Sequence, residues 1–186
     1  MAMPHSATVW TVEMVNALPD DGQRREVIDG ELFVSPAPSL PHQHALSVLA
    51  YRLHLYTTER RVGLLLFAPF DITFSPNTNV QPDLMILPLV DGRSPRSWQE
   101  AGRLLLCAEI LSPATAWLDR GKKRRLYQRE RVPEYWVVDV DGRVIERWRP
   151  DDARPEICDE GLTWLPEGQT EPFTLNVREL FESLGG

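Results

Sequence analysis

The sequence predicts a mixed α+β (α/β) domain in which helices flank a central sheet. Residues 42–59 have helical periodicity, residues 83–87 and 104–111 are short apolar runs typical of central strands, and turn signals join pairs of short strands elsewhere. The chain has 186 residues, which suits one domain over residues 1–186 and is too short for two well-developed ones. We therefore expect one sheet with two main helices.

The N-terminal third is expected to hold a short helix, a hairpin and a long helix. Apolar residues three apart indicate a helix over residues 9–18. Strands over 26–28 and 31–34 are joined by Asp29-Gly30, a strong signal for a two-residue turn. The helix over 42–59 follows Pro41, which suits a first helical turn.

The rest of the chain continues this alternation of strands and helices. Besides the two central strands, we expect strands over 64–67, 70–74, 135–140 and 144–148, a very basic helix over 116–131 and a short helix over 177–184. Asp141-Gly142 marks the turn of the second hairpin, and the remainder of residues 150–186 is expected to be a loop.

The charge of the chain is unevenly distributed. It has 27 acidic and 20 basic residues, a formal charge of −7, which argues against a surface that is basic throughout. Residues 120–131 contain seven basic residues and one acid, a local charge of +6, and the other residues carry −13. The distribution therefore indicates one localised basic helix on an acidic body.

Other features narrow the class of protein. The chain has two cysteines, Cys107 and Cys158, and neither lies at zinc-ligand spacing, which suits a reducing compartment. Residues 1–10 lack a basic segment followed by an apolar stretch, and the apolar runs are too short to cross a membrane. We expect a cytoplasmic protein with no membrane contact. The sequence shows no glycine-rich phosphate loop, serine nucleophile elbow or zinc cluster. No small organic cofactor is expected.

Two carboxylates occupy unusual positions in the central strands. Asp83 opens an apolar strand after Gln81-Pro82, and Glu109 lies inside the most apolar stretch, residues 104–111. A carboxylate in such an apolar strand is costly to bury, so it must be paired, bind a metal or point to solvent. Each acid alone is most simply an ordinary strand-end residue. Together at adjacent strand ends they would repel unless a cation lay between them, and oxygen ligands favour Mg²⁺ or Mn²⁺ over zinc.

The basic helix could supply a lysine to these acids. Asp119, Lys123 and Tyr127 recur every four residues and share one helix face. A solvated helix flank is the ordinary alternative. A functional role requires that Lys123 turns inward, toward Asp83 and Glu109.

These residues together resemble the PD-(D/E)-x-K nuclease pattern, with Pro82-Asp83, Glu109-Ile110-Leu111 and a lysine displaced to the following helix, Lys123. Leu111 stands where the broader pattern has lysine. More specifically, the chain resembles the Uma-type restriction endonuclease family in five ordered blocks from about residue 26 to residue 148. The blocks are Glu26–Leu32, Pro38–His42, Val80–Leu84, Glu109–Pro113, and Asp119–Lys123 continued by Tyr127 and residues 132–139.

The resemblance implies a restriction-endonuclease-like mixed sheet core flanked by helices and a Mg²⁺-dependent (or Mn²⁺-dependent) endonuclease that cuts DNA. It implies Asp83, Glu109 and the carbonyl of Ile110 as metal ligands, with Lys123 orienting or helping to deprotonate the attacking water. Glu31 or Glu26 would add a further acid. The sequence leaves both possible, and we expect Glu31.

The same resemblance suggests substrate contacts. His42 could touch substrate or assist protonation, although a structural hydrogen bond at the helix start explains it equally well. Candidate phosphate contacts are Arg120, Lys122, Arg124 and Arg125. A homodimer is expected, because cutting both strands favours two sites.

Three other functions stay open at this point. The chain could be a catalytically inactive nuclease-fold domain that binds nucleic acid or protein, or a metal-dependent hydrolase of small phosphate esters. It could also be a structural domain whose sheet pairs with another copy through the hairpin of Trp136 and Trp148.

Overall fold

The computed structural model describes residues 8–185, so most of the N-terminal segment searched for a signal peptide lies outside the described residues. The helices are α1 (Val12–Asn16), α2 (Leu40–Glu59), α3 (Trp98–Ala101), α4 (Ala116–Leu118), α5 (Arg124–Arg129) and α6 (Val177–Glu182), and a π-helical turn, η1 (Asp119–Lys123), joins α4 to α5. The strands are β1 (Arg24–Ile28), β2 (Glu31–Ser35), β3 (Gly63–Phe67), β4 (Ile72–Ser75), β5 (Thr78–Val80), β6 (Leu84–Pro88), β7 (Leu106–Ile110), β8 (Tyr135–Asp139), β9 (Val144–Trp148), β10 (Glu156–Cys158), β11 (Gly161–Trp164) and β12 (Phe173–Asn176). Within the described residues, no helix is long and apolar enough to cross a membrane.

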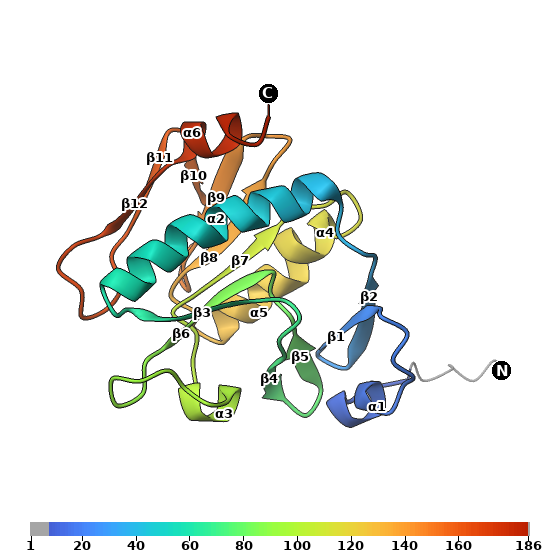
Figure 1. Cartoon of the computed structure of the whole chain (residues 1–186). Coiled ribbons are helices and arrows are strands. Elements are labelled where there is room, and N and C mark those ends of the chain that lie inside the picture. Colours follow the sequence, from blue (N-terminus) through green and yellow to red (C-terminus); the bar gives the residue numbers. More distant parts are fainter. Residues whose placement is uncertain (1–7, 186) are drawn as a thin grey trace.

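The central sheet has six strands in the order β10-β9-β8-β7-β6-β3 (Figure 1). Its neighbouring strands are antiparallel except for β7 and β8, which are parallel and joined by the crossover through α4, η1 and α5. Two smaller sheets, β2-β1-β5-β4 and β11-β12, accompany it. The predicted α+β class is confirmed, but the prediction of one sheet is wrong, because the N-terminal hairpin pairs with β5 and not with the central strands.

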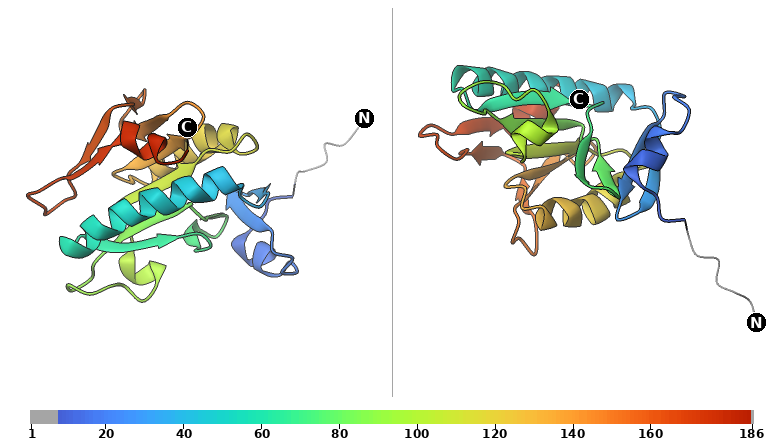
Figure 2. Two further views of the ribbon diagram at one scale, coloured as in Figure 1. Left: turned by 45° about the horizontal axis from the view of Figure 1, so that its top comes forward. Right: turned by 90° about the horizontal axis from the view of Figure 1, so that it is seen from below.

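The two faces of the central sheet are covered by different elements. Side chains alternate along β6, so Leu84 and Ile86 pack toward α2, while Met85 and Leu87 pack toward α5 and the N-terminal sheet. Figure 2 shows α2 along one face and α5 on the opposite side. Burying one such side chain contributes about 1.5–3 kcal/mol, so both layers stabilise the sheet.

Most predicted elements are present with small shifts. The first hairpin turns at Asp29 and Gly30, whose φ angles of 52° and 82° fit the expected two-residue turn. The long helix begins two residues earlier than predicted, with Ser39 as its N-cap. The first helix is shorter than predicted, and the predicted strand over 70–74 begins only at residue 72. The predictions missed β5, β10, β11 and β12, so the expected loop over residues 150–186 is wrong where the last three of these strands lie. Apolar residues do alternate with exposed ones in β11 and β12, but each of these strands has only four residues.

The predicted basic helix is interrupted at its centre. Instead of one α-helix over 116–131, the chain forms α4, the wider turn η1 and then α5, which ends at Arg129. Asp119, Lys123 and Tyr127 nevertheless share the inward face, with relative exposures of 2%, 2% and 0%. Single π-helical turns inside helices occur frequently at functional sites.

The hairpin of β8 and β9 does not expose its tryptophans. Trp136 is fully buried and packs against Trp164 with ring centroids 6.1 Å apart. Trp148 is also buried, and the guanidinium of Arg124 lies 4.7 Å from its ring centroid. These side chains are therefore covered by the chain itself, which removes the reason to expect a second copy at this hairpin.

Candidate functional site

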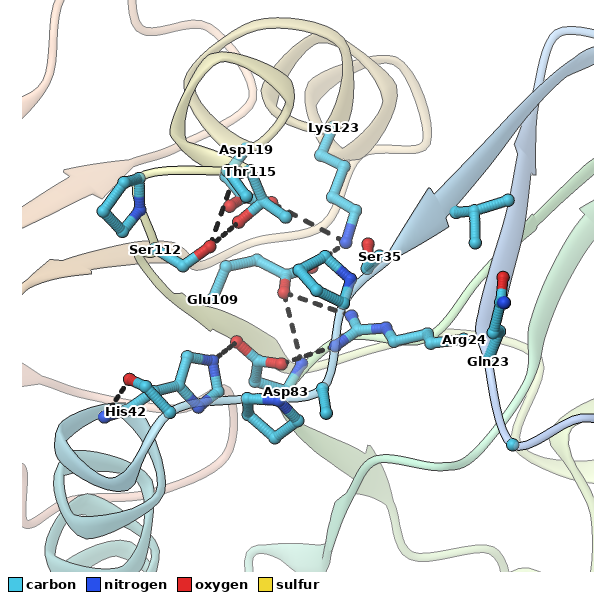
Figure 3. Close-up of a pocket in the computed structure, with 18 residues that line it drawn as sticks. Gln23, Arg24, Ser35, His42, Asp83, Glu109, Ser112, Thr115, Asp119 and Lys123 are labelled. Atoms are coloured by element: carbon cyan, nitrogen blue, oxygen red, sulfur yellow. Dashed lines mark hydrogen bonds and ion pairs between the residues drawn. The ribbon is translucent and has the colours of Figure 1, made fainter.

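A pocket of about 820 Å³ lies where the start of β6 meets the end of β7. The register pairs Leu84 with Ala108, so the residues just beyond this pair, Asp83 and Glu109, are placed beside each other. The antiparallel pairing thus explains why two carboxylates 26 residues apart in sequence reach one pocket. Lys123 enters from the helix, Arg24 from β1 and His42 from the start of α2 (Figure 3).

Asp83 is held by donors from several elements. Its Oδ2 accepts hydrogen bonds from the backbone N–H of Ile110 at 2.8 Å and from Nε2 of His42 at 3.0 Å. Its Oδ1 lies 2.7 Å from Nη1 of Arg24. Its own backbone N–H donates to Oε2 of Glu109 at 3.3 Å. Asp83 is therefore fixed in position on the floor of the pocket.

Glu109 and Glu26 share the ammonium group of Lys123. Nζ of Lys123 lies 2.9 Å from Oε1 of Glu109 and 2.9 Å from Oε2 of Glu26. The hydroxyl of Tyr127 donates to the same oxygen of Glu109 at 3.2 Å, and the backbone N–H of Gln81 donates to Oε1 of Glu26 at 2.7 Å. All these side chains except that of Gln81 are almost fully buried, so the lysine is locked between two acids.

The protonation of these groups follows from burial and charge. Burial acts to raise the pKa of Asp83, but the hydrogen bond of His42 and the charge of Arg24 outweigh it and hold this pKa below its usual range. At Glu109 burial dominates: Lys123 offsets it only in part, the charge of Asp83 adds to it, and the pKa rises to about 8. Burial also raises the pKa of Asp119. Burial thus favours the protonated form of Glu109.

Lys123 behaves in the opposite way. Burial alone would lower the pKa of its ammonium group, but the charges of Glu109 and Glu26 outweigh burial and raise this pKa. Lys123 is therefore a permanent cation and hydrogen-bond donor in this arrangement. It cannot serve as a base while both acids contact it.

The acid cluster is short of positive charge. Four buried carboxylates, those of Glu26, Asp83, Glu109 and Asp119, face the cations Arg24 and Lys123. When all four acids are ionised, the cluster lacks two positive charges, which is the charge of one divalent ion. In residues 8–185, no group of three or more His, Cys, Asp or Glu side chains is arranged to hold a metal ion by itself. The chemistry and charge of the oxygens fit a hard divalent cation, which Asp83 and Glu109 could hold.

Comparison with known proteins identifies the family of the chain. A family model described as "Putative restriction endonuclease", Uma2, matches residues 12–178. The chain belongs to the Uma2 family. It is also similar to a crystal structure described as "a putative nuclease" from Anabaena variabilis, with 19% sequence identity and a TM-score of 0.77 over 94% of this chain and 99% of that one. At this identity the likeness establishes the fold. The sequence matches no curated protein.

In this Uma2 family member, Glu26 is the inward acid and the expectation of Glu31 is wrong. In the hairpin, Glu26 lies opposite Phe33 and Glu31 lies opposite Ile28. Both acids point to the same face, but Glu31 is about 7 Å further along the ladder, at the turn. Its side chain is 57% exposed and pairs with Lys122. Face alternation therefore could not distinguish the two acids.

The basic helix offers less free charge than its composition suggests. Arg120 binds Asp139 and Glu146, each at 2.7 Å, Lys122 pairs with Glu31, and Arg124 stacks on Trp148. These contacts argue against Arg120, Lys122 and Arg124 as free phosphate contacts. Of the four predicted contacts, only Arg125 is exposed and makes no ion pair within the described part of the chain.

The structure places His42 at the site. Of the two roles left open by the sequence, a substrate contact and a structural hydrogen bond, His42 makes the hydrogen bond. Its Nε2 contacts Asp83, and its Nδ1 is buried with no hydrogen-bond partner in the described residues. Ser39 caps its backbone N–H at 3.4 Å. His42 therefore orients Asp83 directly.

Sequence reasoning missed Arg24. This residue contacts Asp83 at 2.7 Å and lies 3.6 Å from both Glu26 and Glu109. The signal was present, because Arg24 and Glu26 alternate with Val27 and Arg25 and so share the face of the buried Ile28. A polar pair on the inward face of a strand requires partners in the interior.

Proposed function

We propose that this chain is a metal-dependent endonuclease that hydrolyses phosphodiester bonds of DNA with the help of Mg²⁺ or Mn²⁺. The observation that carries the proposal is the buried acid cluster at the pocket, two positive charges short when ionised and built around Asp83 and Glu109. Membership of the Uma2 family supports the reaction class.

The chain supplies oxygen ligands and their orientation. Asp83 and Glu109 would bind the ion, together with the carbonyl of Ile110. A bound divalent ion would lower the pKa of a water molecule and neutralise charge on a phosphate oxygen. His42 and the N–H of Ile110 hold both hydrogen-bonding positions of one Asp83 oxygen, Oδ2, which leaves the carboxylate no freedom to rotate.

Lys123 would act through its charge and its donors. Because its pKa is raised, it is suited to orient the attacking water and to stabilise negative charge on the phosphate, and not to accept a proton. Glu26 would be the further acid of the site in place of Glu31, because it holds Lys123 at 2.9 Å.

Plasmid nicking tests the proposal. Purified protein with Mn²⁺ or Mg²⁺ is expected to relax supercoiled plasmid, and Asp83→Asn is expected to abolish this activity. Asp151→Asn is the matched control, because the Asp151 side chain is 82% exposed and, among residues 8–185, pairs only with Arg131. Equal activity of the two variants would contradict the site assignment.

Two further assays on the purified protein distinguish the proposed nuclease from an inactive binding domain and from a hydrolase of small phosphate esters. An inactive domain that binds nucleic acid or a protein partner needs no metal, so calorimetry with Mn²⁺ would give no binding heat. A hydrolase of small phosphate esters would cleave a chromogenic phosphodiester and leave plasmid intact. A cytoplasmic location and a homodimer remain predictions. Sedimentation velocity of the purified protein tests whether it is a dimer in solution.

A further inference from the structure

The cation on the open side of the acid cluster is Arg24. Its side chain is 23% exposed, whereas that of Lys123 is 2% exposed. The two cations use different oxygens: Lys123 contacts Oε1 of Glu109, and Arg24 faces Oε2 of Glu109 and Oδ1 of Asp83. Figure 3 shows the guanidinium of Arg24 between these two carboxylates. Arg24 thus pairs with one of the two acids that we assign to the metal and faces the other.

The contacts of Arg24 are incomplete. Nη1 lies 2.7 Å from Asp83, but Nη2 lies 3.6 Å from both Glu26 and Glu109, beyond hydrogen-bond distance, and donates to the carbonyl of Gln81. Its Nε is buried and has no hydrogen-bond partner within the described residues. A guanidinium has five donors, and a buried donor without a partner costs free energy. The arrangement therefore compensates the charge of the acids but leaves donors of the Arg24 guanidinium without partners. A divalent ion, which coordinates carboxylate oxygens directly, can displace Arg24 from them.

We propose that Arg24 is an internal counter-ion that pairs with Asp83 and faces Glu109 in the metal-free protein, and that it competes with the divalent ion for both acids. The inference rests on the proposed function, because it concerns the same metal site. A guanidinium and a divalent cation repel each other and cannot both contact these oxygens at full strength. Arg24 is thereby a positioning residue: it keeps the two carboxylates together before metal binds, and it sets the metal concentration that the site requires.

The sign of one change in affinity separates this role from a purely structural one. Arg24→Gln removes the competing charge and is expected to tighten Mn²⁺ binding about tenfold in calorimetry, equivalent to about 1.4 kcal/mol. Arg25→Gln is the matched control: Arg25 is the next residue of β1, points to the other face and pairs with Asp21 at 2.5 Å. The affinity of the Arg25→Gln variant for Mn²⁺ is expected to stay within about twofold of the parent value.

The outcomes distinguish the two proposals. If the parent protein binds Mn²⁺ and a folded Arg24→Gln variant binds it equally or more weakly, Arg24 is a structural partner and the inference is overturned while the nuclease proposal stands. If neither protein binds Mn²⁺, both proposals are overturned. Binding by the variant alone would support the competition.

A measurement on the parent protein covers the case in which Arg24→Gln does not fold. The side-chain N–H signal of Arg24 in a nitrogen-15 spectrum can be assigned by its loss in Arg24→Lys. Saturation with Mg²⁺ is expected to shift this signal, because the contacts to Asp83 and Glu109 are lost. An unchanged signal at saturating Mg²⁺ would overturn the inference.

Discussion

Replacing Glu109 with Gln removes a carboxylate from the most buried part of the site. In the metal-free protein Glu109 holds its proton up to a pKa of about 8, so glutamine imitates the neutral form that is present at about pH 6. At about pH 4 the unfolded chain also keeps most of this proton, so there the free energy of unfolding is expected to change by less than about 1 kcal/mol. At about pH 6 the unfolded parent has lost the proton, and the glutamine variant is expected to be more stable than the parent by roughly 2 kcal/mol. If Glu109 were instead ionised and paired with Lys123, replacing it with glutamine would lower the free energy of unfolding by about 3–5 kcal/mol.

The difference between the two proteins should grow with pH. Above its usual value near 4.5, Glu109 has lost its proton in the unfolded chain but keeps it in the folded one. The folded state then binds more protons, so the stability of the parent protein falls as pH rises and levels off above about pH 8. Between about pH 6 and about pH 9 the parent protein is expected to lose roughly 2–3 kcal/mol relative to Glu109→Gln.

Urea denaturation in the presence of a chelator, at a series of pH values, measures this difference. Glu31→Gln is the control, because the Glu31 side chain is 57% exposed, and it should follow the parent protein. Parallel pH profiles for the parent and Glu109→Gln would show that Glu109 is ionised throughout. The conclusion that burial favours the protonated form of Glu109 would then fall.

Three further outcomes are expected. Lys123→Met should lower the rate of DNA cleavage by about 10²-fold, whereas Lys122→Met should leave it near the parent rate; a larger effect of Lys122→Met in the same plasmid assay would reverse the choice of lysine. Glu26→Gln should lower the cleavage rate and Glu31→Gln should not, and equal rates would contradict the position of Glu26 as the inward acid. Arg125→Gln should reduce the slope of log affinity for DNA against log salt by about one, measured by fluorescence anisotropy with Ca²⁺, and an unchanged slope would show that Arg125 touches no phosphate.

Local pattern was sufficient for most elements and for the central part of the site. An Asp in the first position of an apolar strand and a Glu inside another are visible without coordinates, because burial of a charge is improbable without a partner. The spacing of four between Asp119, Lys123 and Tyr127 predicted their common face, although it did not predict the π-helical turn that carries the first two.

Contacts between distant elements had no local signal. Arg120 finds Asp139 and Glu146, and Arg129 finds Asp29 100 residues away. The charge of the helix taken alone predicted a phosphate-binding surface, yet much of that charge is neutralised by acids from other strands. Composition gives the sum of charges in a segment, and only packing decides which of them remain free.

The sequence alone determined which residues are chemically unusual. Asp83 and Glu109 stand out as carboxylates in apolar strands. Lys123 shares a helix face with Asp119 and Tyr127, since period fixes the face on which a side chain lies. Only the tertiary structure decided that Glu26 and not Glu31 meets Lys123, and that Arg24 stands between the two acids. The reason is that Glu26 and Glu31 share one face of a hairpin, so their period is uninformative. What separates them is their distance along the ladder from the end of β7, a distance set when the N-terminal sheet packs on the central one.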